Sequence, residues 1–435
     1  MLRVPIEQAQ PGMVLGLGVM HPRRKGTTLL RSGYELTELA IRQLGEQDVR
    51  DLWIRYPSLA FIARHVSPEV ESGRSEVASL MGRALESISR EGGGRMDYAK
   101  YASAVSGLVE GLLNSPEANV LVQEVGGAGD AMARHSSDVT YLSLLMGLKL
   151  DWYLVRERKR MSPERAKNVF NLGVAAMLHD IGMIDLDAET LERWQETLDE
   201  RDTTWRRHVL SGYERLKEEI EAPASAAVLH HHQRWDGSGF PAREVAPGVR
   251  EGLRGSQIHI FARIIAAADL FDRLRYPPGT TERLPVVRAQ RRLLEPPYCD
   301  WIDPVVLRAL FVVAPAFTIG TMAELSDGRK VVVTSLNESQ PCRPVVHTLD
   351  DEALSGADAS AAETEGERID LSEHPDLTIA RSDGEDVSDD VFTLPGDWDA
   401  VLKEGAIGGL VLHHGDHGEH DDRGDETVGE LREAG

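Results

Sequence analysis

The amino-acid sequence predicts a mainly α protein, in which a helical bundle lies between a small N-terminal α+β module and a small C-terminal β module. Three observations predict this class. Apolar residues recur at helical spacing between about residues 131 and 313. Short β-like runs and turn residues stand before and after that region. Residues 383–435 contain 16 acidic and 3 basic side chains, which is typical of a disordered tail.

The N-terminal α+β module is expected over residues 1–65. Residues 13–20 and 49–54 resemble strands, and residues 36–44 have helical spacing. A helical connector is expected over residues 66–128, and the glycines at 92–94 predict that it forms two helices or one broken helix. These helices could pair between two chains, so a homodimer stays open.

The helical bundle is expected over residues 129–316. Ser162, followed by Pro163 and Glu164, predicts a helix start, and this helix is expected to continue through Asp180. Further helices are expected at residues 203–220, 224–231, 258–274 and 285–294. Five or more helices without intervening strands indicate an all-α bundle.

The small β module is expected over residues 317–382. Two strand-like runs at residues 318–325 and 331–335 flank a turn at 326–329, which is a hairpin pattern. Residues 383–435 are predicted to form an acidic, disordered tail. The histidines of that tail are interpreted as part of a flexible segment and not as a functional metal site; they are His413, His414, His417 and His420.

Charge and composition exclude several classes of protein. The formal net charge is −23, of which residues 383–435 contribute −13. A general nucleic-acid-binding surface needs dense Lys and Arg, although metal ions could supply positive charge for a small anionic ligand. The apolar stretch at residues 170–184 is too short for a membrane span and contains His179 and Asp180. The N-terminus resembles no signal peptide, and Cys299 and Cys342 are expected to be reduced, so a cytoplasmic location is expected.

The adjacent residues His179 and Asp180 stand in a segment of Val, Ala, Met and Leu that is expected to be buried. Burying a charge without a partner is costly, and a metal ion would satisfy both side chains. Imidazole and carboxylate suit Fe, Mn, Co, Ni or Zn, and the second carboxylate oxygen is free to bridge to a neighbouring ion. The pair therefore indicates a two-metal centre of the kind that hydrolyses phosphate esters.

Further candidate ligands stand on other predicted helices of the same region: His135, His208, His231, His232 and Asp269. A single helical His is more often a hydrogen-bonded core or surface residue than a ligand, and His230 is assigned to that class. Asp272 is expected to face solvent or to be paired. The joint occurrence of ligand residue types on five segments favours one shared metal centre.

Separate motifs in this region resemble the HD-GYP branch of the HD phosphohydrolase superfamily. The motifs are Arg134-His135-Ser136, Leu178-His179-Asp180-Ile181-Gly182, the segment from His208 to Gly212, and the segment from His231 to Pro241, with Asp269 in a final ligand motif. The resemblance covers about residues 131–317. It implies an HD-type helical bundle that hydrolyses cyclic di-GMP to the linear dinucleotide or GMP.

The resemblance also implies roles for individual residues. His179 and Asp180 are catalytic, Asp180 bridges two divalent ions, and a metal-bound hydroxide attacks phosphorus. Fe or Mn is favoured, and Zn, Ni or Co is compatible. The implied metal ligands are His135, His179, Asp180, His208, His231, His232 and Asp269. The loop at residues 236–241 shapes the substrate entrance and, in the family, contacts diguanylate cyclase domains. The residues assigned to substrate and loop are Arg234, Asp236, Gly239, Phe240 and Pro241.

The sequence departs from the family pattern on the substrate side. Met183 stands where the family usually has Lys, which removes a cation that could contact phosphate. Gln233 replaces the usual Glu, Phe240 replaces the Tyr of the family name, and residues 244–255 form an insertion. Ala131 stands where some members place a Glu for a third metal, so two ions are expected.

Two alternatives to a cyclic di-GMP phosphodiesterase stay open. One is a metal-binding sensor or scaffold with weakened catalysis in cyclic-dinucleotide signalling. The other is an HD hydrolase that acts on another nucleotide. The complete set of seven ligand residues favours an enzyme, because a scaffold has no physical need for all of them.

Overall fold

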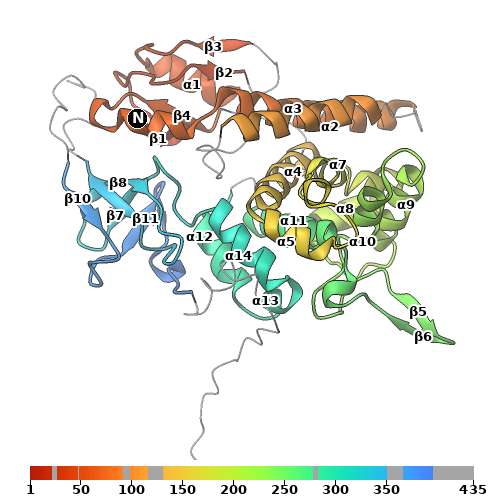
Figure 1. Ribbon diagram of the computed structural model, residues 1–435. Coiled ribbons are helices and arrows are strands. Elements are labelled where there is room, and N and C mark those ends of the chain that lie inside the picture. The colour runs from red at the N-terminus through yellow and green to blue at the C-terminus, as the bar shows by residue number, and fades with distance from the viewer. Residues whose placement is uncertain are drawn as a thin grey trace, which may run out of the picture.

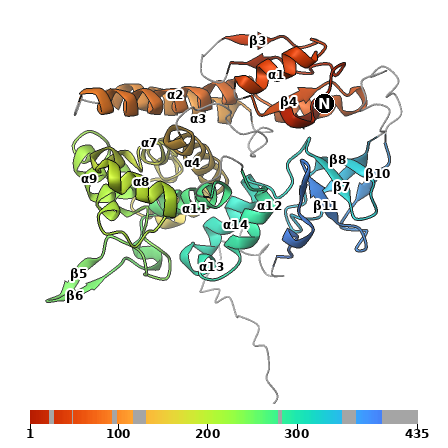
Figure 2. The ribbon, with the colours of Figure 1, turned by 180° about the vertical axis from the view of Figure 1, so that it is seen from behind.

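The computed structural model describes residues 1–21, 27–47, 49–91, 98–115, 131–277, 283–349 and 366–394. A helical bundle is covered on one side by the two helices of the connector and by the N-terminal module, and a β module stands beside it (Figure 1; the reverse side is in Figure 2). The prediction of a mainly α protein with small flanking modules is confirmed. Residues 395–435 of the predicted acidic tail, which include its four histidines, lie outside the described residues.

The N-terminal module is built from two short antiparallel strand pairs and one helix. Strand β1 (Leu2–Pro5) pairs with β4 (Asp51–Ile54), and β2 (Val19–Met20) pairs with β3 (Thr28–Leu30). Helix α1 (Glu38–Glu46) begins after Thr37, whose side chain accepts a hydrogen bond from the Ala40 amide. Two 3-10 helices complete the module: η1 (Ile6–Gln8) and η2 (Pro57–His65). The strand expected at residues 13–20 is thus reduced to its last two residues.

The connector consists of two long helices, α2 (Pro68–Glu91) and α3 (Tyr98–Asn114). They lie against each other along the top of the bundle in Figure 1, and α2 packs on helix α4 (Ala131–Lys149). The residues between them, which include the three glycines, lie outside the described part. Since both helices bury apolar residues in the bundle core, the connector belongs to the same packed body as the bundle.

The bundle contains helices of different lengths packed around one apolar core. After α4 they are α5 (Asp151–Glu157), α6 (Pro163–Ala166), α7 (Phe170–Met177), η4 (Ile181–Asp185), α8 (Ala188–Thr197), η5 (Trp205–Arg207), α9 (His208–Leu216), α10 (Ala222–His230), η6 (Gly255–Gln257), α11 (Ile260–Arg275), α12 (Val286–Leu293), α13 (Tyr298–Trp301) and α14 (Pro304–Val313).

Two expectations for the bundle are wrong in detail. The helix that was expected from Ser162 through Asp180 is divided into α6 and α7, and α7 ends at Met177, so His179 and Asp180 stand in a turn. The inserted segment forms a hairpin of β5 (Arg243–Ala246) and β6 (Val249–Glu251), so the bundle does contain intervening strands. Each strand of this hairpin contains an exposed valine, Val245 or Val249, and β-branched residues favour strands.

The C-terminal module is a six-stranded antiparallel sheet in the order β10-β9-β8-β7-β11-β12. The hairpin that was predicted at residues 318–335 is present as β7 (Met322–Leu325) and β8 (Lys330–Ser335). The other strands are β9 (Val345–Thr348), β10 (Arg368–Asp370), β11 (Ile379–Ser382) and β12 (Glu385–Asp386), and the short helix η7 (Ser388–Asp390) follows them.

The boundary expected between the β module and the tail, at residues 382 and 383, falls inside a hairpin. Asp383 and Gly384 both have positive φ, 49° and 91°, which suits a two-residue turn between β11 and β12. The ordered module therefore continues past Ser382 to at least Leu394, which is buried. The Asp-Gly pair at these positions was a sequence signal for a hairpin turn, although it stands in an acidic segment.

The N-terminal and C-terminal modules share one apolar core. Ile319 and Val332 of the β module pack with Leu52 and other residues of the first module. Arg3 of β1 donates to Thr321 at 2.8 Å and forms an ion pair with Asp383 at 2.5 Å. The two ends of the described chain are therefore joined across the molecule. No helix among the described residues is long and apolar enough to cross a bilayer.

Candidate metal centre and adjoining cavity

Seven side chains from five segments of the bundle converge at one place. His135 lies in the first turns of α4, and His179 and Asp180 follow α7. His208 begins α9, His231 and His232 follow α10, and Asp269 lies on α11. Adjacent side chains within a helix point about 100° apart, so a turn at the helix end is needed to direct two neighbours to one point. The two paired motifs stand in such turns.

The seven side chains form two groups. In each group, one potential ligand atom per residue lies within 4.8 Å of the others: His208, His231 and His232 with Asp180, and His135 and His179 with Asp269. The Asp180 carboxylate stands between the groups. Its Oδ1 lies 3.4 Å from His208 Nε2 and 3.5 Å from His231 Nε2, and its Oδ2 lies 3.5 Å from His179 Nε2.

Three of the imidazoles are oriented in the same way. The Nδ1 atoms of His179, His208 and His231 lie 2.7–2.8 Å from the backbone carbonyl oxygen three residues earlier. A carbonyl can only accept, so each Nδ1 carries the proton and each Nε2 presents a lone pair to the centre. Burial lowers the pKa of His179 and of His208 to about 4, so both rings are neutral at pH 7. Neutral imidazole is the form that binds metals.

The carboxylates of the centre are held in the ionised form. Burial alone would raise the pKa of Asp180, but the imidazoles of His179, His231 and His208 hold it well below its usual range. Burial opposes ionisation of Asp269 too, yet Arg273 and His135 lower its pKa to about 2. The donor set is therefore anionic oxygen with neutral nitrogen, which suits borderline divalent ions.

Two buried polar atoms test whether a cation fits. Asp180 Oδ1 and His232 Nε2 are buried, and neither has a hydrogen-bond partner among the described residues. Unpaired buried polar atoms are costly, and a cation between them would satisfy both. Helices α7 and α10 also direct their C-terminal ends, which carry partial negative charge, toward this point. The residues present fit a divalent metal ion.

His135 is positioned by a carboxylate outside the two groups. Its Nδ1 lies 2.6 Å from Asp272 Oδ2, and Arg134 donates to Asp272 Oδ1 at 3.2 Å. Burial would lower the pKa of His135, but hydrogen bonds to Asp269 and Asp272 raise it to about 10. Metal binding at Nε2 therefore releases a proton. Asp272 was expected to face solvent or to be paired, and it is paired. Its hydrogen bond fixes the ring orientation of a candidate ligand.

The glycine of the His-Asp-Ile-Gly motif permits the close packing of η4 on α9. A Cβ on Gly182 would lie 2.0 Å from the His208 carbonyl oxygen and 2.5 Å from the Gly212 amide nitrogen. Any larger residue would separate the segment that carries Asp180 from the helix that carries His208. Gly182 and Gly212 thus set the distance between two ligand-bearing elements.

The loop after His232 is tied down by Gln233. The Gln233 amide donates to the Pro241 carbonyl at 2.7 Å and accepts from the Leu253 amide at 2.8 Å. Asp236 accepts hydrogen bonds from Ser238 and stabilises the turn. A Cβ on Gly239 would lie 2.4 Å from the Arg234 amide nitrogen, so only glycine fits. The amide of Gln233 both donates and accepts, which a carboxylate in its place could not do.

Met183 and Phe240 are core residues. With Trp205 and Val209 they form a buried cluster, and Met183 is 2% exposed. Phe240 stacks on the His232 ring, with centroids 4.7 Å apart. A Lys at position 183 would therefore have to extend out of an apolar cluster to reach the centre. These two departures shape the wall of the centre rather than an open surface.

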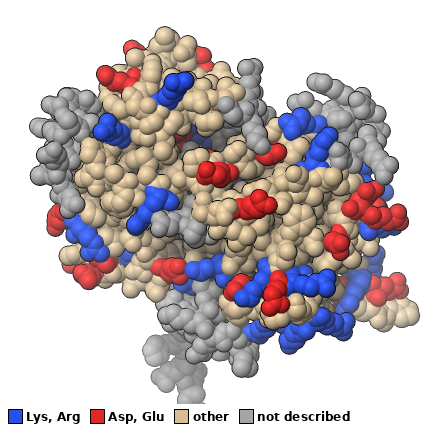
Figure 3. Space-filling view, turned by 45° about the horizontal axis from the view of Figure 1, so that its top comes forward, with Lys and Arg blue, Asp and Glu red and all other residues tan. Residues whose placement is uncertain are grey.

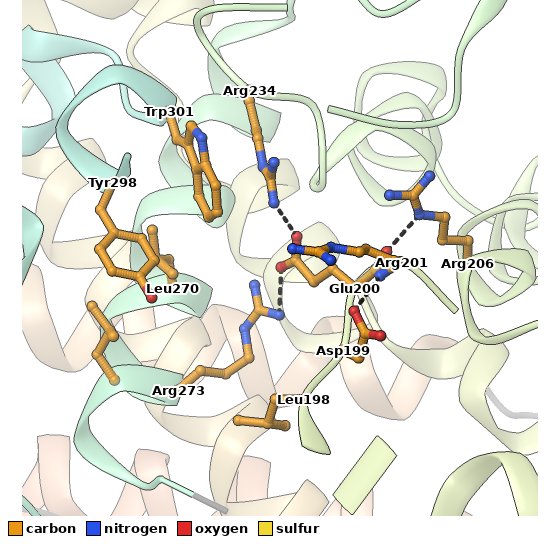
Figure 4. Close-up of a pocket in the computed structure, with 11 residues that line it drawn as sticks. Leu198, Asp199, Glu200, Arg201, Arg206, Arg234, Leu270, Arg273, Tyr298 and Trp301 are labelled. Atoms are coloured by element: carbon orange, nitrogen blue, oxygen red, sulfur yellow. Dashed lines mark hydrogen bonds and ion pairs between the residues drawn. The ribbon is translucent and has the colours of Figure 1, made fainter. Parts of the chain in front are cut away.

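A cavity of about 330 Å³ opens beside the centre, and Figure 4 shows its lining. The lining contains four arginines and two acidic residues, with an aromatic wall. The lining residues are Leu198, Asp199, Glu200, Arg201, Arg206, Arg234, Leu270, Arg273, Leu274, Tyr298 and Trp301. A narrow extension is lined by His231, His232 and Asp269 and so joins the cavity to the metal centre. Of the five residues predicted for substrate and loop, Arg234 lies in this lining.

Sequence reasoning missed Arg273 and Glu200. Arg273 follows Asp269 by four residues on α11, so helical spacing alone places both on one face. The sequence therefore contained a signal that could have identified Arg273. Glu200 lies in the loop between α8 and η5, and only the tertiary structure brings it to the cavity.

The fold and the site define the class of protein as a helical bundle with a divalent-metal centre, and comparison with known families agrees. Residues 153–291 match the family described as HD domain. HD domains bind divalent metal, so the chain contains a metal-binding domain of this class. His135 lies before the matched residues.

Some characterised proteins resemble the chain beyond the matched domain. The chain is 26% identical, over 370 residues, to a cyclic di-GMP phosphodiesterase of Pseudomonas aeruginosa, with 76% of this chain and 81% of that protein covered. It is 34% identical, over 124 residues, to a cyclic di-GMP phosphodiesterase response regulator of Xanthomonas campestris, with 28% and 30% covered. An HD-GYP-type protein of Bdellovibrio bacteriovorus has a solved structure that resembles this one with a TM-score of 0.39 and 15% identity, over 71% of this chain and 97% of that one. The matched HD domain, together with similarity to cyclic di-GMP phosphodiesterases over most of the chain, supports the HD-GYP family.

Proposed function

We propose that this protein is a metal-dependent phosphodiesterase that hydrolyses cyclic di-GMP to the linear dinucleotide or GMP. One observation carries the proposal: the two oxygens of Asp180 face two separate groups of ligand atoms, next to a cavity rich in arginine. The relatives named as cyclic di-GMP phosphodiesterases support the choice of substrate.

The proposed centre holds two divalent ions, with Fe or Mn favoured. His208, His231 and His232 would hold one ion, His135, His179 and Asp269 the other, and Asp180 would be shared. When bound, the ions would supply Lewis acidity that activates water and neutralises the phosphate. The ligand set suits several ions, so availability decides which of them binds.

The protein residues contribute orientation and a dry wall. The carbonyl groups that accept from Nδ1 of His179, His208 and His231 keep each Nε2 directed at the centre. Trp205 lies against the rings of His208 and His232 and stacks on Trp194 with centroids 3.7 Å apart. This aromatic wall excludes water from one side of the centre, which strengthens electrostatic interactions there. The phosphate would enter from the open side, through the cavity.

The test uses purified protein loaded with Mn(II) or Fe(II) and incubated with cyclic di-GMP, with the linear dinucleotide and GMP separated by chromatography. Asp180→Asn should lose turnover by a factor of at least about 1,000, because it removes the shared anionic ligand, and should bind less metal. The exposed Asp376→Asn is the matched control.

Three outcomes would contradict the proposal. Stoichiometric metal without turnover of any cyclic dinucleotide indicates a sensor or scaffold. Turnover of another cyclic dinucleotide alone indicates a different substrate. Unchanged turnover in Asp180→Asn excludes the assigned centre. Contact between residues 236–241 and a diguanylate cyclase domain, and a homodimer, stay predictions.

A further inference from the structure

The carboxylate of Glu200 lies inside the cavity, between two arginines. It forms an ion pair with Arg273 at 2.8 Å and a second ion pair with Arg234. Figure 4 shows both guanidinium groups directed at this carboxylate, one from each side. All three side chains are less than 20% exposed, so the contacts are shielded from solvent.

The loop between α8 and η5 holds Glu200 in place. Helix α8 ends at Thr197, and its C-cap residue Leu198 adopts a left-handed conformation with φ 48°. Asp199 accepts a hydrogen bond from the Arg201 amide, and Arg206 Nε donates to the Glu200 carbonyl oxygen at 2.6 Å. These contacts position the Glu200 backbone at the cavity rim, so that its side chain enters the cavity.

The two arginines stand beside the metal centre. Arg273 Nη2 donates to Asp269 Oδ2 at 2.6 Å, and Glu200 Oε1 lies 3.9 Å from His232 Nδ1. An anion that replaced the Glu200 carboxylate would therefore lie next to two candidate metal ligands. That is the position in which a phosphate would have to bind if the centre acts on it.

The arginines are arranged to receive a phosphate. Guanidinium groups bind carboxylate and phosphate oxygens with the same forked geometry, so a carboxylate held by two arginines occupies a phosphate-like position. The Arg234 guanidinium lies flat against Trp301, 3.3 Å from the ring centroid, and is thus held in its orientation before a ligand binds. With Glu200 displaced, the cavity lining would keep four arginines against one acidic residue.

We propose that Arg234 and Arg273 form a phosphate-binding subsite for the cyclic dinucleotide, and that Glu200 is a built-in competitor which must leave this subsite before the substrate binds. The inference rests on the proposed function. It assigns to Arg273, on α11, the substrate-binding cation that is absent at Met183. It also makes the loop at residues 198–202 a device that lowers the affinity for phosphate ligands.

The experiment measures binding of GMP to the metal-loaded full chain by calorimetry, since GMP carries one phosphate and contains no phosphodiester bond to be hydrolysed. Glu200→Gln should bind GMP about tenfold more tightly, the size expected for one charge-assisted contact. Binding of guanosine, which lacks the phosphate, should not change. The exposed Glu196→Gln, on the same helix–loop segment, is the matched control with the same loss of charge.

The arginines are tested in the same assay. Arg234→Gln should weaken GMP binding about tenfold or more without loss of metal, because Arg234 makes no contact with a candidate ligand. Arg273→Lys should weaken it less than Arg273→Gln, since Lys keeps the charge but not the fork. In turnover of cyclic di-GMP, Glu200→Gln should lower KM more than it changes kcat.

Equal or weaker GMP binding by Glu200→Gln, with metal content and thermal stability retained, would overturn the proposal. So would a gain in guanosine binding as large as the gain in GMP binding, because the effect would then not concern phosphate. If GMP binding responds as expected but cyclic di-GMP is not hydrolysed, the subsite stands and the proposed function fails. If hydrolysis occurs without that response, the proposed function stands and this inference fails.

Discussion

At the scale of single residues, the uncharged Met183, which stands where the family usually has Lys, is explained by its buried apolar surroundings. Its side chain is 2% exposed and lies among Trp205, Val209 and Phe240. A charged ammonium in that cluster would lose its hydration without gaining a partner. Position 183 is therefore fitted to an apolar residue in this chain, and the arginines of the cavity lie on a different element.

Met183→Lys should destabilise the protein and should not raise activity. We expect a loss of about 2–4 kcal/mol in the free energy of unfolding, as for other unpaired buried charges. Met183→Leu, which conserves apolar character and approximate volume, should cost less than about 1.5 kcal/mol. Urea unfolding and kcat measured on both variants check this. A stable Lys variant with a higher kcat would mean that this position reaches the substrate.

His259 gives stability a pH dependence that is separate from the metal centre. Its Nδ1 accepts a hydrogen bond from the Phe261 amide and so caps α11, which requires an unprotonated nitrogen. Burial, followed by the charges of Arg158 and Arg263, lowers the pKa of His259 to about 4. Below pH 6.5 the unfolded chain therefore binds the proton more readily than the folded chain, and stability falls as the pH falls from about 6.5 toward 4.

His259→Asn should remove this part of the pH dependence while keeping the cap, because Asn also accepts at helix N-termini. Between pH 7.5 and pH 5, the wild type should lose about 2 kcal/mol more than the variant. Denaturant unfolding at both pH values measures the difference, and exposed His374→Asn serves as the control. Identical losses in the wild type and in His259→Asn would contradict this origin.

At the scale of elements, a buried chain of ion pairs connects α2 to the metal centre. Arg74 on α2 contacts Asp138 on α4 at 3.3 Å, and Asp138 contacts Arg134 at 3.2 Å. Arg134 in turn contacts Asp272, which positions His135. The packing of the connector helix on α4 thus fixes a candidate metal ligand through three carboxylate–arginine contacts.

Asp138→Asn should therefore lower stability and metal affinity together. Removing one partner of a buried pair typically costs about 3–5 kcal/mol, because it leaves uncompensated charge. Loss of such outer contacts weakens metal binding by about 10- to 100-fold. Asp151→Asn breaks an exposed pair with Lys167 and should cost less than about 1 kcal/mol. A normal metal affinity in Asp138→Asn would show that the chain of contacts does not support the centre.

At the scale of the whole molecule, the net charge of the chain and the charge of the cavity lining have opposite signs. The chain carries −23, and acidic and basic side chains are intermingled on the face in Figure 3, where Lys and Arg gather at the lower right. The cavity beside the metal centre nevertheless has twice as many arginines as acidic residues. Local potential in a shielded cavity depends on the groups that line it, since exposed charges beyond about 10 Å are screened by salt.

The extent of the C-terminal module predicts how the chain can be shortened. A chain that ends after Ser382 loses Asp383, the partner of Arg3, and Asp390, the partner of Arg288, together with buried Leu394. It should be less stable than a chain that ends after Leu394, by on the order of 3–5 kcal/mol. Thermal unfolding of the two truncated chains compares them. Equal stabilities would place the end of the folded part at Ser382, as the sequence alone suggested.

The sequence predicted the fold class and the local periodicities on which it depends. The helical spacing of the bundle and the turn between β7 and β8 are local signals, and the structure contains both. The end of α7 was predicted wrongly, because helical propensity continues through the apolar residues up to Leu178 while the packing of Gly182 on α9 requires a turn. Long-range contacts decided this helix end, and no local pattern carries them.

What the sequence determined by itself is the chemistry of the centre. A carboxylate and several imidazoles in apolar surroundings require a polar or cationic partner wherever they fold, because unpaired buried polar groups are costly. The tertiary structure alone decided how those side chains are divided into two ligand groups and which residues line the adjoining cavity. The position of Asp180 between two ligand groups, and of Glu200 between Arg234 and Arg273, depends on the packing of helices that are distant in sequence. Those positions follow from three-dimensional packing, and residue types and spacings do not encode them locally.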